Sequence, residues 1–247
     1  IPIITGFICK NEDGKITTLG RGGSDLTATF IGECCNSYEI QVWKDVDGLM
    51  TADPKYVKNA KPVSKLSYEQ ASELAYFGAK ILHPISMLPA TRSKIPVRIK
   101  NSYNRSCLGT VISNDKNNDY DKELIIAMTE KKDITLIDVV STRMLEQSGF
   151  LSKVFKVFEE ENVWIDVIAT SDISISLTLD SKNNISKNAV SRLQSVANVN
   201  VKTGFSIISL ISNLEKSSIV LEKVFKILSR NNINIEMISQ GASKVNI

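Results

Sequence analysis

Hydrophobic and polar residues follow one rhythm before about residue 112 and another after residue 134. In the first part, short apolar runs alternate with stretches of helical periodicity and few hairpin turns. The expected elements are a strand over 1–8, a helix over 24–35, a strand over 39–43, a helix over 67–79 and a strand over 96–100. Ser67 and Gln70 have capping-box spacing at the start of the second helix. This alternation predicts a three-layer α/β domain.

The second part contains an internal repeat, which is visible without any knowledge of a family. Residues 153–158 (Lys-Val-Phe-Lys-Val-Phe) recur 70 positions later as 223–228 (Lys-Val-Phe-Lys-Ile-Leu). The same register then aligns residues 162–168 with 232–238. The two copies should therefore fold alike.

Each copy begins with a strand, an amphipathic helix and a second strand. For the first copy we expect strands over 134–140, 163–169, 173–179 and 199–202, and helices over 149–161 and 186–197. This order is βαββαβ, the ferredoxin-like arrangement. For the second copy we expect strands over 206–211, 233–239 and 244–247, and a helix over 217–231. By the register, the second copy stops within its third strand, so we expect an incomplete module.

The polar segment 114–121 has no periodicity and is the expected linker between the two parts. The predicted domains are residues 1–122, the first repeated module 134–203 and the second module 204–247.

Composition places the chain among soluble globular proteins. It has 247 residues, of which 43% are hydrophobic and 23% charged, and its formal net charge is +3. No basic arm or acidic tail points to nucleic acid or a membrane as a partner. The apolar runs are far shorter than the roughly 20 residues of a membrane span.

Cysteine and histidine are too sparse for most metal or hydrolase chemistry. Cys9, Cys34, Cys35 and Cys107 show no C-x-x-C spacing, so we expect reduced, mostly buried thiols and no metal site. His83 is the single histidine, which leaves little room for a Ser-His-Asp triad. We expect it to be packed and hydrogen-bonded.

The strongest local signal is the glycine-rich stretch over residues 17–28, Thr-Thr-Leu-Gly-Arg-Gly-Gly-Ser-Asp-Leu-Thr-Ala. Glycines allow the backbone to approach a ligand, and the helix that follows offers free N–H groups to an anion. Arg21 can bind a carboxylate through two parallel hydrogen bonds. The alternative is a plain glycine turn in which Ser24 or Asp25 caps the helix and Arg21 faces solvent.

Two further segments carry charges where a ligand would bind. Lys44, Asp45 and Lys55 follow a buried strand, and ligands of open α/β sheets sit beyond the carboxyl ends of strands. Surface turn charges are the alternative reading. Lys80 follows Gly78 at an expected helix end, where its ammonium can face a phosphoryl group in transfer.

These segments together closely resemble the aspartokinases of the amino acid kinase family. The resemblance is carried by residues 17–28, 42–48, 53–54, 73–84, 96–101, 141–144, 149–151, 169–171 and 240–247. It covers nearly the whole chain except 114–121 and is nearest to the monofunctional, lysine-sensitive plant type. That likeness is the basis for expecting the chloroplast stroma, or the cytoplasm in a source other than a plant.

The resemblance implies transfer of the γ-phosphoryl group of ATP to the side-chain carboxylate of L-aspartate. Mg²⁺ would be carried mainly by ATP. The implied aspartate contacts are Arg21, Gly22, Gly23 and Ser24. The implied nucleotide contacts are Lys44, Asp45, Met50, Lys55, Lys80 and Ile81. Asp25 would orient the lysines around the phosphates, and Lys80 would stabilise the phosphoryl group in flight.

Two departures from the family pattern concern the nucleotide site. Many bacterial relatives have tyrosine where Met50 stands and arginine at Lys55. The family's Lys-Phe-Gly-Gly loop, which supplies another phosphate-binding lysine, has no counterpart in this sequence. We therefore expect a piece of a longer enzyme that lacks both ends.

The repeated modules resemble ACT domains, which bind small molecules and pair side by side, so we expect a homodimer or larger assembly. Lysine is the expected effector, with Asp166 facing its ammonium and the amides near Gly149 its carboxylate. The implied effector residues are Met144, Gln147, Gly149, Phe150, Leu151, Trp164, Ile165, Asp166, Thr170 and Ser171. The alternative is that these residues only pack an interface.

Two other functions remain open. The chain on its own would be an inactive amino-acid-binding regulatory module if the missing phosphate loop is indispensable. A glutamate or uridylate kinase is less favoured, because such kinases lack paired ACT modules after the kinase domain.

Overall fold

The computed structural model divides the chain into two compact units. It describes residues 2–77, 82–114, 124–142, 148–180, 183, 185–212, 216–241 and 244–246. The first unit comprises residues 1–129, 209–232 and 242–244, and the second comprises 130–208, 233–241 and 245–247. Strands β7 (Ile125–Val140) and β10 (Asn198–Ser212) each contribute residues to both units.

The first unit contains a four-stranded mixed sheet in the order β3-β5-β6-β4. Its strands are β3 (Ile40–Lys44), β5 (Val97–Asn101), β6 (Thr110–Ile112) and β4 (Lys65–Leu66). Strands β3 and β5 are parallel, and their pairing places Ile40 opposite Val97 and Lys44 opposite Asn101. Their carboxyl ends therefore meet at one edge of the sheet, where ligands of α/β proteins bind.

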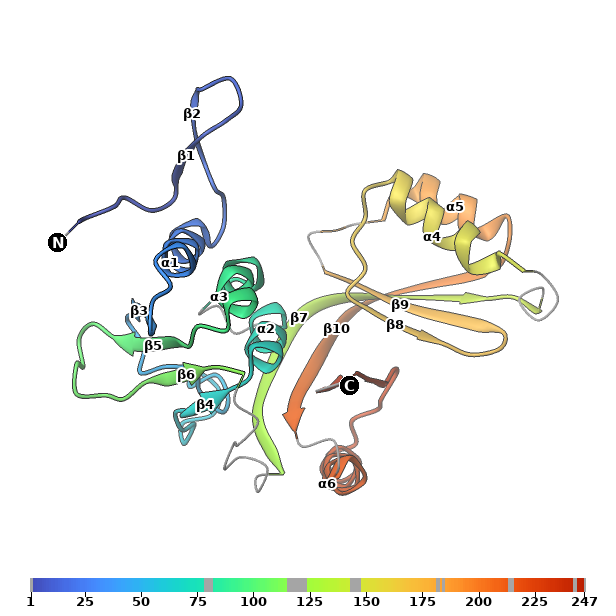
Figure 1. The fold of residues 1–247 in the computed structure, drawn as a ribbon. Helices are drawn as coiled ribbons and strands as arrows, with labels where there is room; N and C mark the ends of the chain where they lie inside the picture. The colour runs from blue at the N-terminus through green and yellow to red at the C-terminus, as the bar shows by residue number, and fades with distance from the viewer. Residues whose placement is uncertain are drawn as a thin grey trace. The chain divides into compact units, whose positions relative to one another are not determined.

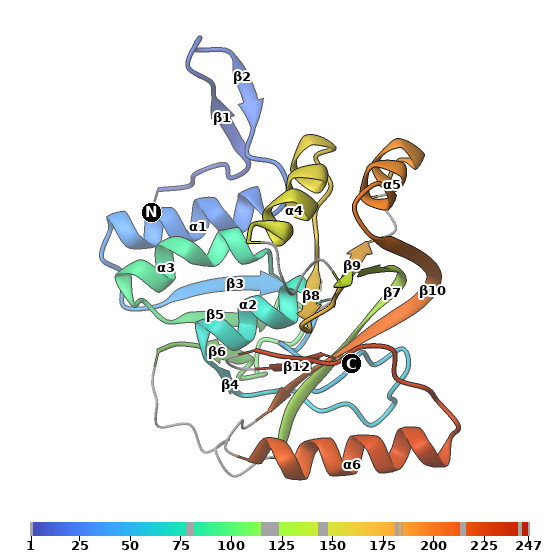
Figure 2. The same cartoon turned by 90° about the vertical axis from the view of Figure 1, so that its right-hand side faces the viewer.

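Helices α1 (Gly23–Cys34) and α3 (Leu88–Ser93) lie along the same side of this sheet (Figures 1 and 2). Arg92 joins them by donating to both carboxylate oxygens of Glu33, and this bond lowers the pKa of Glu33. Helix α2 (Tyr68–Tyr76) begins at the predicted capping box, since Ser67 and Gln70 exchange both hydrogen bonds. The helices expected over 24–35 and 67–79 are thus confirmed within a few residues.

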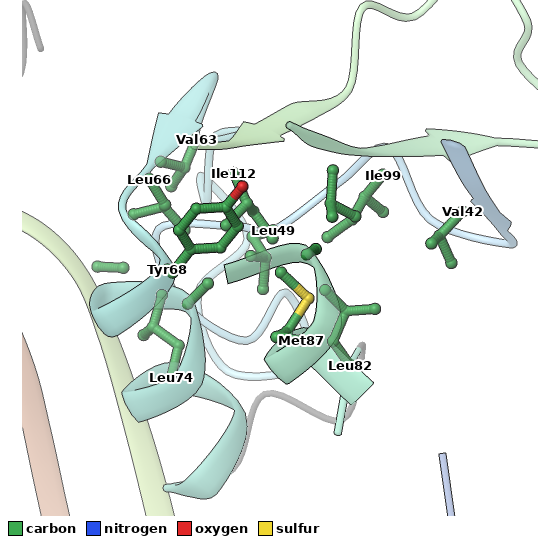
Figure 3. Close-up of a cluster of buried hydrophobic side chains, with 14 of the residues drawn as sticks. Val42, Leu49, Val63, Leu66, Tyr68, Leu74, Leu82, Met87, Ile99 and Ile112 are labelled. Atoms are coloured by element: carbon green, nitrogen blue, oxygen red, sulfur yellow. The ribbon is translucent and has the colours of Figure 1, made fainter. Parts of the chain in front are cut away.

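The apolar core of this unit lies between the sheet and its helices (Figure 3). Val97, Ile99 and Ile112 are completely buried, and burial of such a side chain stabilises the fold by roughly 1.5–3 kcal/mol. Tyr68 joins the same cluster and donates its hydroxyl hydrogen to the carbonyl oxygen of Ile95. The core therefore holds α2 against the sheet.

The strand expected over 1–8 is wrong. Residues 2–6 are irregular, Ile3 is 94% exposed, and pairing begins at the hairpin of β1 (Ile8–Lys10) and β2 (Ile16–Thr18). An apolar run raises strand propensity, but a strand also needs a partner for its backbone N–H and C=O groups. Within the described residues, β2 is the strand that pairs with this segment, and the pairing starts at Ile8.

The second unit has the predicted mixed α/β arrangement. Strand β7 pairs antiparallel with β9 (Ser174–Asp180), and β9 pairs antiparallel with β8 (Val167–Thr170), within a sheet of order β11-β12-β10-β7-β9-β8. Helices α4 (Phe150–Glu160) and α5 (Lys187–Gln194) lie side by side (Figure 1). Their apolar residues pack with those of β7 and β9 into a second core.

The second copy of the repeat supplies α6 (Ser217–Arg230), β11 (Ser239–Gln240) and β12 (Lys244–Asn246). Asn162 and Asn232, 70 positions apart, follow α4 and α6 with positive φ angles of 52° and 53°. Asparagine tolerates this left-handed conformation at a helix end. The repeat read from the sequence is thus also a repeat of backbone geometry.

Strand boundaries in this unit differ from the expected ones. The strands expected over 199–202 and 206–211 form one strand, β10, which continues through Gly204 at φ 84°. Strand β7 begins at Ile125 rather than at 134, and Ile126 and Ala127 near its start are buried in the apolar core of the first unit. Strands β8 and β11 begin several residues later than expected, after irregular segments that follow the two asparagines.

Candidate functional site

The glycine-rich loop leads directly into α1. Gly20 and Gly22 have φ angles of 74° and 73°, and Gly22 is the N-cap residue. A Cβ atom on Gly22 would lie 2.4 Å from the Cβ of His83, so both conformation and space require glycine there. No side chain caps α1, so the alternative in which Ser24 or Asp25 caps the helix is wrong. The N-terminus of α1 is therefore open to an anion.

Lys44 and Asp25 form the central ion pair of this region. The Nζ of Lys44, at the carboxyl end of β3, donates to both carboxylate oxygens of Asp25 at 2.9 Å. Asp25 lies in the first turn of α1, where the helix dipole favours a negative charge. Both side chains are partly buried. The pair thus holds the Lys44 ammonium beside the N-terminus of α1.

The neighbouring parallel strands complete this edge of the sheet. The backbone N–H and hydroxyl of Ser102 both donate to the carbonyl oxygen of Lys44. The side-chain amides of Asn101 and Asn104 donate to one carboxylate oxygen of Asp47, at 2.8 and 3.2 Å. Sequence reasoning did not single out Asp47 as a site residue. Its position after a buried strand, with Asn101 at the end of another, was the available signal.

The other predicted residues of the loop and the strand edge lie at the surface. Arg21 and Ser24 are exposed on either side of Gly22 and Gly23, and Asp45 is exposed beyond Lys44. They are therefore accessible to a ligand.

Met50 and Lys55 lie on a loop that is closed at its base. Met50 forms a bridge with Pro62, and Lys55 is exposed. The base is held by Thr110, whose hydroxyl accepts from the N–H of Leu49 at 2.8 Å and donates to the carbonyl oxygen of Val63 at 2.6 Å. The loop is thus tied to β6 of the sheet.

Two predicted nucleotide contacts, Lys80 and Ile81, lie outside the described residues. The prediction for His83 is confirmed: it is half-buried, and its Nδ1 accepts from the N–H of Ile85 at 3.3 Å. It also packs against Gly22 of the glycine-rich loop.

The predicted effector residues fall around α4 and β8. Gly149 is the N-cap of α4 with φ 83° and no side-chain cap. Phe150 is buried, Leu151 is exposed, and Trp164 is 73% exposed. Ile165 packs on the core of the second unit. The remaining surface residues, Thr170 and Ser171, are exposed, whereas Met144 and Gln147 lie outside the described residues.

Asp166 has a partner already. Its side chain is 3% exposed and accepts from the Nζ of Lys131, on β7, at 2.6 Å. The same ammonium lies 3.5 Å from Asp180. A ligand ammonium at Asp166 would have to compete with Lys131, which sequence reasoning did not identify.

The four cysteines are free thiols, as predicted, but the expectation that most are buried is wrong. Cys34 and Cys35 are exposed at the end of α1, and Cys9 and Cys107 are half-buried. Among the described residues, no three His, Cys, Asp or Glu side chains converge as a metal site would require. None of the described helices is both long and apolar enough to cross a membrane.

Comparison with known proteins matches both parts of the chain. Residues 1–101 match the amino acid kinase family, and residues 137–196 and 208–247 match the ACT domain. The chloroplastic aspartokinase 1 of Arabidopsis thaliana is 51% identical over 256 residues, an alignment that covers all of this chain and 45% of that protein. The chain thus spans about half the length of the curated relatives it matches.

Solved structures of aspartokinases are also similar to this chain. Escherichia coli aspartokinase III, with aspartate and ADP in its R state, is 36% identical with a TM-score of 0.82, and the match covers 98% of this chain and 55% of that one. The same enzyme with lysine and aspartate in its T state gives a TM-score of 0.77 at the same identity and coverage.

Proposed function

The chain belongs to the aspartokinases, whose amino acid kinase region and ACT domains it carries, and on this basis we propose that it acts in the ATP-dependent phosphorylation of L-aspartate. A carboxylate oxygen of the aspartate side chain forms a bond to the γ-phosphorus as the bond from that phosphorus to ADP breaks. The products are 4-phospho-L-aspartate and ADP. This reaction opens the synthesis of lysine, threonine, methionine and isoleucine.

The observation that carries this proposal is the Lys44–Asp25 pair beside the uncapped N-terminus of α1. Phosphoryl transfer needs positioned positive charge rather than a covalent nucleophile. Asp25 holds Lys44 by both of its oxygens, so the ammonium is kept in one place. The N–H groups at the start of α1 add positive potential at the same point.

The aspartate substrate would bind at the glycine-rich loop. Arg21 would grip a carboxylate through two N–H groups, and the backbone of Gly22, Gly23 and Ser24 would approach it closely. The exposure of Arg21 and the left-handed φ of Gly22 support this assignment.

ATP would bind along the carboxyl edge of β3 and the loop that Thr110 ties down. Lys44, Asp45, Met50 and Lys55 would contact the nucleotide, joined by Lys80 and Ile81 from outside the described residues. Lys80 would stabilise the phosphoryl group in flight. Mg²⁺ would enter with ATP and keep several of its waters, because both oxygens of Asp25 are engaged by Lys44.

Regulation would come from the ACT modules, with L-lysine as the inhibitor. The T-state complex of E. coli aspartokinase III with lysine and aspartate supports this choice of effector. Asp166 would pair with the effector's ammonium, and the uncapped N-terminus of α4 at Gly149 would take its carboxylate. A homodimer formed through the ACT modules and a place in the chloroplast stroma belong to the same proposal, the latter supported by the chloroplastic Arabidopsis relatives.

The test is a coupled assay of ADP release with ATP and L-aspartate. Arg21→Ala should raise the aspartate KM steeply with little change in the ATP KM, since it removes a carboxylate anchor. Lys44→Met should instead lower kcat, by about 10²-fold or more if its charge acts in the transition state. Arg230→Ala, an exposed arginine in the last turn of α6, is the matched control.

Two outcomes would count against the proposal. Aspartate-independent ADP release would refute the substrate assignment. Lysine binding without any ADP release would favour the alternative, a regulatory module without kinase activity.

A further inference from the structure

Lys131 stands between two carboxylates in the second unit. Its ammonium lies 2.6 Å from Asp166 and 3.5 Å from Asp180, and its side chain is 17% exposed. Asp166 precedes β8 and donates its backbone N–H to Thr178 of β9, so its position is set by the sheet. The ammonium of Lys131 thus forms ion pairs with two carboxylates that belong to different segments of the same unit.

A carboxylate as buried as Asp166 is strongly destabilising unless it is paired. Lys131 provides that pairing with a primary ammonium group. This is the chemical group by which an amino-acid effector would bind the same carboxylate. The lysine side chain and the effector therefore compete for one position.

The second copy of the repeat has a similar arrangement in a different environment. Glu236 is 70 positions after Asp166, and Lys202 donates to it at 2.7 Å, with Asp138 at 3.8 Å. These side chains are between about a quarter and two fifths exposed, so water screens their charges. A ligand that bound to this pair would gain little free energy from the interaction. Of the two equivalent pairs, the one in the first copy, at Asp166, is buried.

We propose that Lys131 is a built-in occupant of the effector's ammonium position, which an amino-acid effector displaces. The inference rests on the proposed function of Asp166 in effector binding. On displacement, the ammonium of Lys131 passes to Asp180, its second carboxylate. The affinity of the site for the effector therefore depends on the free energy of replacing the Lys131 ammonium at Asp166 by the ammonium of the effector.

The position of Lys131 on β7 gives this exchange a consequence. Three residues earlier on the same strand, the N–H of Met128 donates to the carbonyl oxygen of Thr51 at 2.8 Å. Thr51 lies on the loop that carries Met50 and Lys55. Lys131 and the residue that holds the proposed nucleotide loop therefore lie on the same strand, three positions apart.

The test is calorimetric titration of L-lysine into the full chain and four variants, whose folding is checked first by circular dichroism. Lys131→Met removes the competing ammonium and should tighten lysine binding by roughly tenfold. Asp180→Asn removes the carboxylate that receives Lys131 and should weaken binding several-fold. Lys131→Arg keeps the cation and Lys202→Met alters only the exposed pair, so both should bind lysine much as the wild type does.

The outcomes are distinguishable. If wild type binds lysine and Lys131→Met binds it equally or more weakly, this inference is overturned while the effector assignment stands. Should Lys131→Met fail to fold, Asp180→Asn decides, because unchanged affinity in that variant also overturns the inference. Absence of binding in every protein would overturn both the effector assignment and the inference, whereas the kinase proposal is judged separately by ADP release.

Discussion

The two copies of the repeat have similar sequences but bury them differently. Val157 in α4 is 7% exposed, whereas Ile227, at the same register in α6, is 59% exposed. Four residues of α4 are buried, against Val220 and Leu228 in α6. Helical periodicity is thus enough to specify a helix and its terminal asparagine, but the core that covers it depends on the neighbouring elements.

The same contrast holds for the charged pairs. Lys131–Asp166 is buried and Lys202–Glu236 is largely in solvent. A carboxylate and a lysine have a large effect on stability and binding only where water is excluded. Copy one therefore contains the buried pair on which the proposed effector site rests, and copy two supplies an exposed pair with which it can be compared.

The largest expected difference concerns the core. Phe158→Ala should lower the free energy of unfolding by roughly 3–5 kcal/mol, because this residue of α4 is buried in the core of the second unit. Phe225→Ala, on the partly exposed face of α6, should cost less than about 1 kcal/mol. Denaturant unfolding followed by circular dichroism measures both, and equal losses would contradict the burial difference.

A smaller difference is expected for the charged pairs. Asp166→Ala leaves the Lys131 ammonium with Asp180 as its nearby carboxylate and should cost roughly 1–3 kcal/mol. Glu236→Ala should lower the melting temperature only slightly, since its pair is exposed. A loss at Glu236 as large as that at Asp166 would mean that solvent exposure does not separate the two copies.

At the helix starts, the expected difference in the free energy of unfolding is about 1 kcal/mol. Gly149 precedes α4 with φ 83°, so Gly149→Ala should destabilise the fold by about 1 kcal/mol through backbone strain alone. Lys216, which precedes α6, has φ −110°, where no such strain arises. Thermal unfolding of Gly149→Ala and Gly149→Asn provides the check, because asparagine tolerates this conformation better than alanine does.

The smallest effects appear in the pH dependence. The hydrogen bond from Arg192 lowers the pKa of Glu160 below its ordinary 4.5, so the pair stabilises the fold above that pH and the contribution is lost as the pH falls through the lowered value. Glu236 raises the pKa of Lys202 above 10.5, so that contribution is present below this pH and lost as the pH rises through the raised value.

The two pairs should therefore respond at opposite ends of the pH range. Stability curves of Arg192→Met and Lys202→Met should approach that of wild type at acid and at alkaline pH, respectively. Convergence of both curves at the same end would contradict these pKa directions.

Much of the fold was predictable because its signals are local. Helical spacing identified α1, α2, α4, α5 and α6, and the capping box at Ser67 is present as predicted. The run at residues 1–8 was misread, and β4 and β6 were missed, because a strand is defined by its partner. Two-residue β4 in particular has no pattern of its own.

The candidate site also has features that local sequence predicts and features that depend on distant segments. The glycine-rich loop and the charges after β3 were visible as residue types that suit a phosphate or carboxylate ligand. The family resemblance implied that Asp25 orients lysines, but no local pattern showed the 2.9 Å contact with Lys44, 19 positions away, or the role of Thr110 in closing the Met50 loop. Lys131 was overlooked because its local sequence, Glu-Lys-Lys-Asp over 130–133, resembles an ordinary exposed charge run.

The sequence by itself determined which segments become helices, that the second half is a repeat, and which residue types are available for binding anions and amino acids. These properties depend on neighbours a few positions away. Only the tertiary structure decided which of two equivalent carboxylates is buried and which lysine neutralises it. That choice depends on the exclusion of water by segments distant in the chain, and charge interactions change in strength most where water is removed.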